Sequence, residues 1–335
     1  MTRRISSYLQ RWYFLSVSLT VFCIGFRVSA QDPQYSQFML NQLYFNPAFA
    51  GNTAYPRLIG GYRNQWPGLG NAYVSYYASY DQFVDALQGG VGLGMSRDVQ
   101  GNGVFSKTSA DLCYSYPMEL NGDMSARFGL QASIVQNSVK GAGLILGDQS
   151  PYSNNSYHEV IGNQSKIYTD FSSGISFLYK EQYQINLSVS HINKPADMTG
   201  ITYIYPLPMR FTAQILSQFP SKRSNRNVER VYWRPGLMTQ VQKNNNLIGW
   251  GCNILYSSLT AGIWIRNDMK MTFNTFIFLA GYTKEGFSLY YSYDSWFPRN
   301  YEQVKNYGAH EVTFVYLFKY NDPKKKMRIV KCPKF

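Results

Sequence analysis

After residue 30 the sequence alternates between apolar and polar side chains in runs of about ten residues, separated by Gly, Asn, Asp or Pro. The alternation is clearest in 126–135, 166–180, 183–192 and 286–296. In 286–296 one face carries Phe, Leu and Tyr, and the other carries Ser, Tyr and Asp. A period of two is typical of strands with two chemically different faces. No run after residue 30 has the length of a membrane helix.

The pattern predicts fourteen strands, and their count suggests how they are arranged. The predicted strands span 57–64, 72–83, 88–97, 104–116, 124–137, 166–180, 183–192, 207–219, 231–243, 246–257, 259–268, 271–282, 285–296 and 309–320. An even number suits an up-and-down barrel whose two ends emerge on one side. In lipid, only a closed barrel satisfies every backbone amide of a sheet. Tyr and Trp near many strand ends fit interfacial girdles.

Composition separates the remaining fold classes. Charged residues make up 15% of the chain, against about 25% in average proteins. The mean hydropathy of −0.29 is too polar for a bundle of membrane helices, and 29 Tyr with 21 Phe are too many aromatics for a disordered chain. The alternative is a soluble β-sandwich or propeller, which would carry more Lys and Glu on its outer faces. We therefore expect an all-β fold, a closed antiparallel transmembrane β-barrel of about 14 strands, over residues 53–320.

The first thirty residues have the three regions of a secretory signal peptide. Three Arg lie within the first eleven positions, and a short apolar stretch follows at 12–26. Val28-Ser29-Ala30 offers a small-residue cleavage site. We expect residues 1–30 to be removed, the chain to begin at Gln31, and the protein to reach the outer membrane.

Segment 31–52 lacks the strand pattern. Tyr35, Phe38, Met39 and Leu43 have the spacing of one helix face, and Asn46-Pro47 would end that helix. A short helix is therefore expected. Two interpretations stay open at this point: a simple lead-in to the first strand, or a plug folded into the barrel mouth, because a fourteen-strand lumen has room to be filled.

Positive charge is concentrated in one loop and in the tail. If both chain ends face the periplasm, the long connections 138–165, 193–206 and 297–308 lie outside, and the long loop 220–230 lies on the periplasmic side with the tail 321–335. These segments are either ordinary solvated chain or a docking surface for an acidic partner or lipid head groups. The docking candidates are Lys222, Arg223, Arg226, Arg230, Lys324, Lys325, Lys326, Arg328 and Cys332.

The residues that usually mark a catalytic or metal site are sparse. The alternation puts Cys113 on the inner face and Cys252 on the outer face, so these two do not pair, and Cys332 is free or bonds a partner. No HExxH, CxxC, EF-hand or GxSxG pattern accompanies His158, His191 or His310. We expect no catalytic residues, no cofactor, no metal and no nucleic-acid partner.

Several ordered motifs, dense over residues 31–103, resemble the PorP/SprF family. They occupy 31–38, 46–51, 62–68, 78–81 and 89–94, and the ending 332–335 resembles the family's tail. The residues that carry the resemblance most clearly are Gln31, Asp32, Pro33, Ser36, Gln37, Phe38, Asn46, Pro47, Gly51, Arg63, Gln65, Trp66 and Asp81.

The resemblance implies an outer-membrane component of the type IX secretion and gliding machinery of Bacteroidota. It implies partners among that machine's periplasmic and lipoprotein components, and cargo with C-terminal sorting domains, beside outer-membrane lipid. Two functions stay open. One is a non-enzymatic machine component that docks partners and supports export or surface retention of cargo. The other is a passive outer-membrane channel or apolar-solute transporter.

Overall fold

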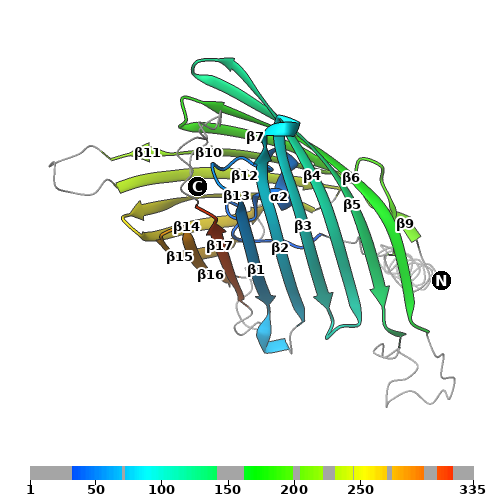
Figure 1. Ribbon diagram of the computed structural model, residues 1–335. Helices are drawn as coiled ribbons and strands as arrows, with labels where there is room; N and C mark the ends of the chain where they lie inside the picture. The colour runs from blue at the N-terminus through cyan, green and yellow to red at the C-terminus, as the bar shows by residue number, and fades with distance from the viewer. Residues whose placement is uncertain are drawn as a thin grey trace, which may run out of the picture. The chain divides into compact units, whose positions relative to one another are not determined.

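The computed structural model describes residues 32–69, 72–141, 162–198, 204–221, 231–243, 245–269, 274–297 and 308–319. Within these ranges, no helix combines the length and apolar character needed to cross a membrane. Nearly all of the described regular structure is antiparallel strand (Figure 1).

Fourteen strands form one closed antiparallel ring, as the sequence predicts. Neighbours in sequence pair in order, Arg57–Gln65 (β1) pairs with the last strand, and Arg210–Ser217 (β10) pairs with Val231–Gln242 (β12), which completes the closure. The other strands of the ring are Tyr73–Val84 (β2), Gly89–Gln100 (β3), Phe105–Asn121 (β4), Met124–Val139 (β5), Gln164–Tyr179 (β6), Tyr183–Ser190 (β7), Asn245–Tyr256 (β13), Leu259–Asp268 (β14), Asn274–Lys284 (β15), Phe287–Phe297 (β16) and Ala309–Leu317 (β17).

The two faces of the ring differ as the alternation predicts. Outward side chains are apolar and exposed, with 64% exposure at Leu130 and 67% at Ile167. Inward side chains are small or polar and buried, such as Ser172 on β6 and Ser292 on β16. Such an apolar outer belt would be unfavourable in water, and lipid is the solvent that suits it.

The two ends of the barrel differ in their connections. At the end where β1 begins and β17 ends, here called the terminal rim, several turns are very short. Glu285-Gly286, for example, joins β15 to β16 with both residues at positive φ, as a two-residue hairpin turn requires. The opposite rim carries the connections between β5 and β6 and between β7 and β10. The second of these includes a small hairpin, Ala196–Met198 (β8) with Ile204–Pro206 (β9).

Four details differ from the sequence-based expectation. The hairpin β8–β9 lies where an unstructured loop is expected, β4 continues past its predicted end to Asn121, and Phe219–Pro220 (β11) adds a short pairing with β12. The expected short helix is present but begins later than the spacing of Tyr35, Phe38, Met39 and Leu43 suggests: the α-helix is Gln42–Phe45 (α2), followed by the 3₁₀ turn Pro47–Phe49 (η1). The break at Asn46-Pro47 is confirmed, and the Asn46 side chain caps η1 by accepting from the Ala48 backbone N–H.

Candidate functional site: the filled lumen

Residues 32–52, here called the luminal segment, lie inside the ring of strands (Figure 1). Residues 35–43 and 45–52 are all buried, and their hydrogen-bond partners come from strands on every side of the barrel. The segment runs from the opposite rim, where Asp32 meets the end of β7, to the terminal rim, where β1 begins. The luminal segment is therefore packed within the lumen along its length.

Asp32 begins the described part of the segment in a cluster of charged groups. Its carboxylate lies 2.7 Å from Nε2 of His191, 3.1 Å from Arg210 and 3.2 Å from Nζ of Lys107. Nδ1 of His191 lies 2.7 Å from Asp170 on β6. Strands β4 and β10 and the end of β7 therefore hold this carboxylate directly, and β6 holds His191.

Both Asp32 and His191 lie outside the membrane-spanning strands, and the cluster shifts their ionisation. Burial raises the pKa of Asp32, but the positive charges of His191, Lys107 and Arg210 more than offset it and hold that pKa well below its ordinary value. Burial lowers the pKa of His191, but Asp32 and a hydrogen bond to Asp170 outweigh burial and raise it. Both shifts favour the charged forms, carboxylate for Asp32 and imidazolium for His191.

A second charged cluster clamps the next turn of the segment. The backbone N–H of Ser36 donates to Glu311 at 2.7 Å, and the Ser36 hydroxyl donates to Asp294 at 2.6 Å. Arg63 bridges these two carboxylates at 3.1 and 2.8 Å, and Arg266 reaches Asp294 at 2.9 Å. These bonds replace the helical hydrogen bonds that the sequence spacing suggested for this stretch, which is why the helix begins only at Gln42.

The middle of the segment is fixed by contacts to the backbone of the wall. The Asn46 amide donates to the carbonyls of Ile175 and Leu187, each at 3.1 Å, and the Ser188 hydroxyl donates to the Phe45 carbonyl at 2.6 Å. A Cβ placed on Gly129 would overlap the backbone of residues 47 and 48. Glycine is therefore required on β5 for the close approach of these two chains.

At the terminal rim the segment meets a third set of charged groups. Gly51 N–H donates to Asp81 at 2.9 Å, and Arg57 pairs with the same carboxylate at 2.9 Å. The carbonyl of Ala50 accepts from Ser115 at 2.6 Å and from Arg127 at 3.0 Å. Strands β1, β2, β4 and β5 together hold the end of the segment just before the ring begins.

Apolar side chains of the segment fill the space between these polar anchors. Tyr35, Phe38, Met39 and Phe45 form one buried cluster with wall residues that include Trp264. The rings of Phe38 and Trp264 meet edge to face with centroids 4.9 Å apart. Burial of each such side chain stabilises the packed state by about 1.5–3 kcal/mol. Two cavities beside the segment each leave only about 10 Å³ of free room, close to the size of one water molecule.

Most of the residues that carry the family resemblance converge on this lumen. Asp32, Ser36, Gln37, Asn46, Gly51, Arg63 and Asp81 all take part in the polar contacts between segment and wall. Pro33 accepts the Tyr44 hydroxyl, Phe38 packs on Trp264, and Pro47 opens η1. Gln65 ends β1 beside Arg63. Trp66 follows it with positive φ and meets the ring of Tyr73 edge to face. Gln31 lies outside the described residues.

The structure does not describe the predicted docking residues. Lys222, Arg223, Arg226, Arg230, Lys324, Lys325, Lys326, Arg328 and Cys332 all lie outside the described residues. Of the other cysteines, Cys113 is buried and Cys252 half-buried, both unpaired, as the face assignment predicts. No group of three metal-binding side chains occurs within the described ranges.

The luminal partners Glu311, Asp294, Arg266, His191 and Arg210 escaped the sequence reasoning. The sequence holds one signal for Asp294, and likewise for Asp170: each lies at an inward position of a strand that carries almost no other charge. A charge on the inward face of such a strand needs a partner inside the barrel. The sequence does not show that the partners come from the luminal segment.

Fold and lumen together define an outer-membrane-type β-barrel whose lumen is occupied by its own N-terminal segment. Residues 27–316 match the model of a family described as type IX secretion system membrane protein PorP/SprF, and the chain belongs to that family. The resemblance read from the motifs is thereby confirmed. None of the curated proteins matches the chain.

Solved structures with a similar outline are distant in sequence. A structure titled CymD monoaromatic hydrocarbon channel aligns with 84% of this chain and 94% of its own, at 11% identity and a TM-score of 0.49. The structure of Omp33 of Acinetobacter baumannii aligns with 79% of this chain and 98% of its own, at 6% identity and a TM-score of 0.44. The structure of a FadL homologue of Pseudomonas aeruginosa aligns with 84% of this chain and 94% of its own, at 10% identity and a TM-score of 0.45.

Proposed function

We propose that this chain is a closed, non-enzymatic outer-membrane component of the type IX secretion machinery. It docks periplasmic or lipoprotein components of that machine and supports export or surface retention of cargo with C-terminal sorting domains. The observation that carries the proposal is the luminal segment. A lumen crossed by three polar clusters and packed with aromatic side chains suits a rigid scaffold better than a passive path for solutes.

The docking surface in this proposal lies at the terminal rim. β10 ends, β12 begins and β17 ends at that rim. Since these strand ends flank the basic loop 220–230 and precede the basic tail 321–335, the proposal has both segments at this end of the ring, where their Lys and Arg residues suit an acidic partner. In the same proposal the terminal rim faces the periplasm, because most of its turns are short, the basic loop being the exception.

The test is an affinity pull-down from outer membranes solubilised in mild detergent. The tagged intact chain is compared with a chain lacking 321–335 and with a full-length chain in which Lys324, Lys325 and Lys326 are replaced by Gln. Recovery of secretion-machine components by the intact chain, with loss in both variants, supports docking through the charge of the tail. Equal recovery by all three chains would contradict a docking role for the tail.

Export through the inner membrane is part of the same proposal. Cleavage after Ala30 would start the chain at Gln31, next to the anchored Asp32. Intact-mass spectrometry of the protein purified from outer membranes measures this directly. The predicted mass is that of residues 31–335, and a mass that includes residues 1–30 would contradict cleavage.

A further inference from the structure

Arg234, on β12 close to the terminal rim, is a buried cation without an acidic partner. Arg234 is only 7% exposed. Nε donates to the side-chain oxygen of Gln218 at 2.8 Å, which occupies one of the five donors of the guanidinium. Across the described part of the chain, no carboxylate lies in ion-pair contact with Arg234.

The other buried arginines of the lumen are matched. Arg57 pairs with Asp81, Arg63 with Asp294 and Glu311, and Arg210 with Asp32. Arg266 shares Asp294, and Arg127 donates to two backbone carbonyls of the luminal segment. A buried charge that lacks a counter-charge is strongly unfavourable. Arg234 differs from these arginines because neither a carboxylate nor a backbone carbonyl of the described residues contacts its guanidinium.

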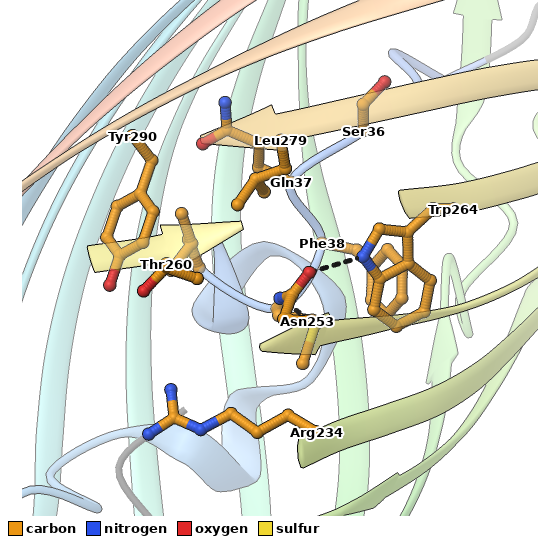
Figure 2. Close-up of a pocket in the computed structure, with 11 residues that line it drawn as sticks. Ser36, Gln37, Phe38, Arg234, Asn253, Thr260, Trp264, Leu279 and Tyr290 are labelled. Atoms are coloured by element: carbon orange, nitrogen blue, oxygen red, sulfur yellow. Dashed lines mark hydrogen bonds between the residues drawn. The ribbon is translucent and has the colours of Figure 1, made fainter. Parts of the chain in front are cut away.

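Arg234 lines a cavity between the luminal segment and strands β12–β16 (Figure 2). The eleven residues around it include no Asp and no Glu, and Phe38 and Leu279 are among them. Thr260 is 5% exposed, and its buried hydroxyl oxygen has no hydrogen-bond partner. Figure 2 shows the hydroxyl ends of Thr260 and Tyr290 on the side toward the guanidinium.

An unpartnered amide oxygen also belongs to the lining of this cavity. The side-chain oxygen of Gln37 is buried without a partner, while its nitrogen donates to Ser292 and to the Glu311 carbonyl. In Figure 2 the Gln37 amide lies at the Leu279 side, away from the Arg234 guanidinium. Beside the Gln218 oxygen, the guanidinium therefore faces hydroxyls, which can donate or accept, and apolar groups, with no carboxylate in the lining.

Size, charge and donor set together select the ligand. The free room is about 10 Å³, which holds one particle of about the size of a water molecule. One guanidinium needs a single negative charge, and a partly apolar lining favours a weakly hydrated ion. We propose that Arg234, with the hydroxyls of Thr260 and Tyr290, binds one chloride-sized monovalent anion. A tetrahedral oxyanion such as phosphate is too large for this space, and the guanidinium repels cations.

The direct test uses bromide as the probe. Crystals of the full-length protein are grown in sodium bromide, and anomalous diffraction is collected at the bromine absorption edge. The expected result is an anomalous peak within contact distance of the Arg234 guanidinium. The peak should disappear in Arg234→Gln and persist in Arg97→Gln, which removes the same charge from an exposed position on β3. Density without anomalous signal at Arg234 in the wild-type protein would overturn the proposal, because it would identify the occupant as water.

The thermal midpoint in solution tests the same site without crystals of the variant. A ligand that binds only the folded barrel raises its thermal midpoint as its concentration rises. The midpoint of the wild-type protein should increase when sodium bromide replaces sodium gluconate at constant ionic strength. The increase should be absent in Arg234→Gln, reduced in Thr260→Val, and unchanged in Arg97→Gln. Equal responses of the wild-type protein and Arg234→Gln would overturn the proposal.

Discussion

Asp32 and His191 lie 2.7 Å apart, carboxylate oxygen to Nε2, although 159 positions separate them in the sequence. The other ring nitrogen of His191 lies 2.7 Å from Asp170. The imidazole ring of His191 thus joins the first described residue of the luminal segment to the wall of the barrel. The attachment of the segment at this rim should therefore depend on pH.

The direction of that dependence follows from the two pKa shifts. His191 has a raised pKa, so its contribution is complete below its ordinary value of about 6.5 and is lost as pH rises through the folded pKa. Asp32 has a lowered pKa, so its contribution is complete above about 3.9 and is lost only as pH falls through the lower folded value. Hydrogen exchange at residues 34–37 should accelerate above neutral pH beyond the intrinsic rate. The additional acceleration should be absent in His191→Gln.

The contact between Gly129 and the luminal segment predicts a size limit on β5. Gly129→Ala would push the wall into the backbone of residues 47 and 48. The expected cost is about 1–3 kcal/mol of unfolding free energy, as for other overpacked sites. Gly60→Ala is the matched control, because its Cβ would meet only a Phe314 side-chain carbon at 3.8 Å. Denaturant unfolding in detergent measures both, and equal stabilities would contradict the close approach.

Glu311 is predicted to be the most sensitive acid of the lumen. It is fully buried, faces Arg63, and accepts the backbone N–H groups of Ser36 and Gln37. Glu311→Gln leaves the guanidinium without this counter-charge and presents a donor to donors, so the expected loss is about 3–5 kcal/mol. Glu285→Gln, in an exposed turn, should change unfolding free energy by less than about 0.5 kcal/mol. Similar small effects of both substitutions would argue against the clamp.

The outer face gives a depth-dependent prediction. Ile263 and Leu259 are 58% and 59% exposed on the same strand, β14, but Ile263 lies midway along it and Leu259 begins it. Arg at the bilayer midplane costs about 2–4 kcal/mol, and near the interface about 0–1 kcal/mol. Ile263→Arg should therefore lower folding yield into vesicles far more than Leu259→Arg. Equal yields would contradict a membrane-spanning β14.

The wall of the barrel could be predicted from the sequence because its signal is local. Alternation along each strand predicts both the strand and its lipid face, and Leu130 and Ser292 lie on the faces so assigned. The lumen could not be predicted in the same way. Ser36 meets Glu311 across 275 positions only after the ring closes between β1 and β17, and no periodicity encodes that meeting.

The luminal segment is less helical than the spacing of its apolar residues suggests, for a related reason. Tyr35, Phe38 and Leu43 have helical spacing, but each packs against a different part of the surrounding wall or segment. Backbone N–H groups at Ser36 and Gln37 donate to Glu311 instead of entering a helix. Because the barrel wall encloses the segment on all sides, its apolar side chains need not share one helix face, which is what helical spacing assumes.

Single-channel recording in planar bilayers tests the central claim, that the luminal segment closes this barrel. The full-length protein is compared with a chain lacking residues 32–52, each inserted from detergent at matched protein concentration. The account predicts a silent full-length protein and reproducible conductance steps after deletion, because the segment supplies the aromatic and polar contacts that fill the lumen. Reproducible open-channel steps from the full-length protein would contradict the account and support a passive channel.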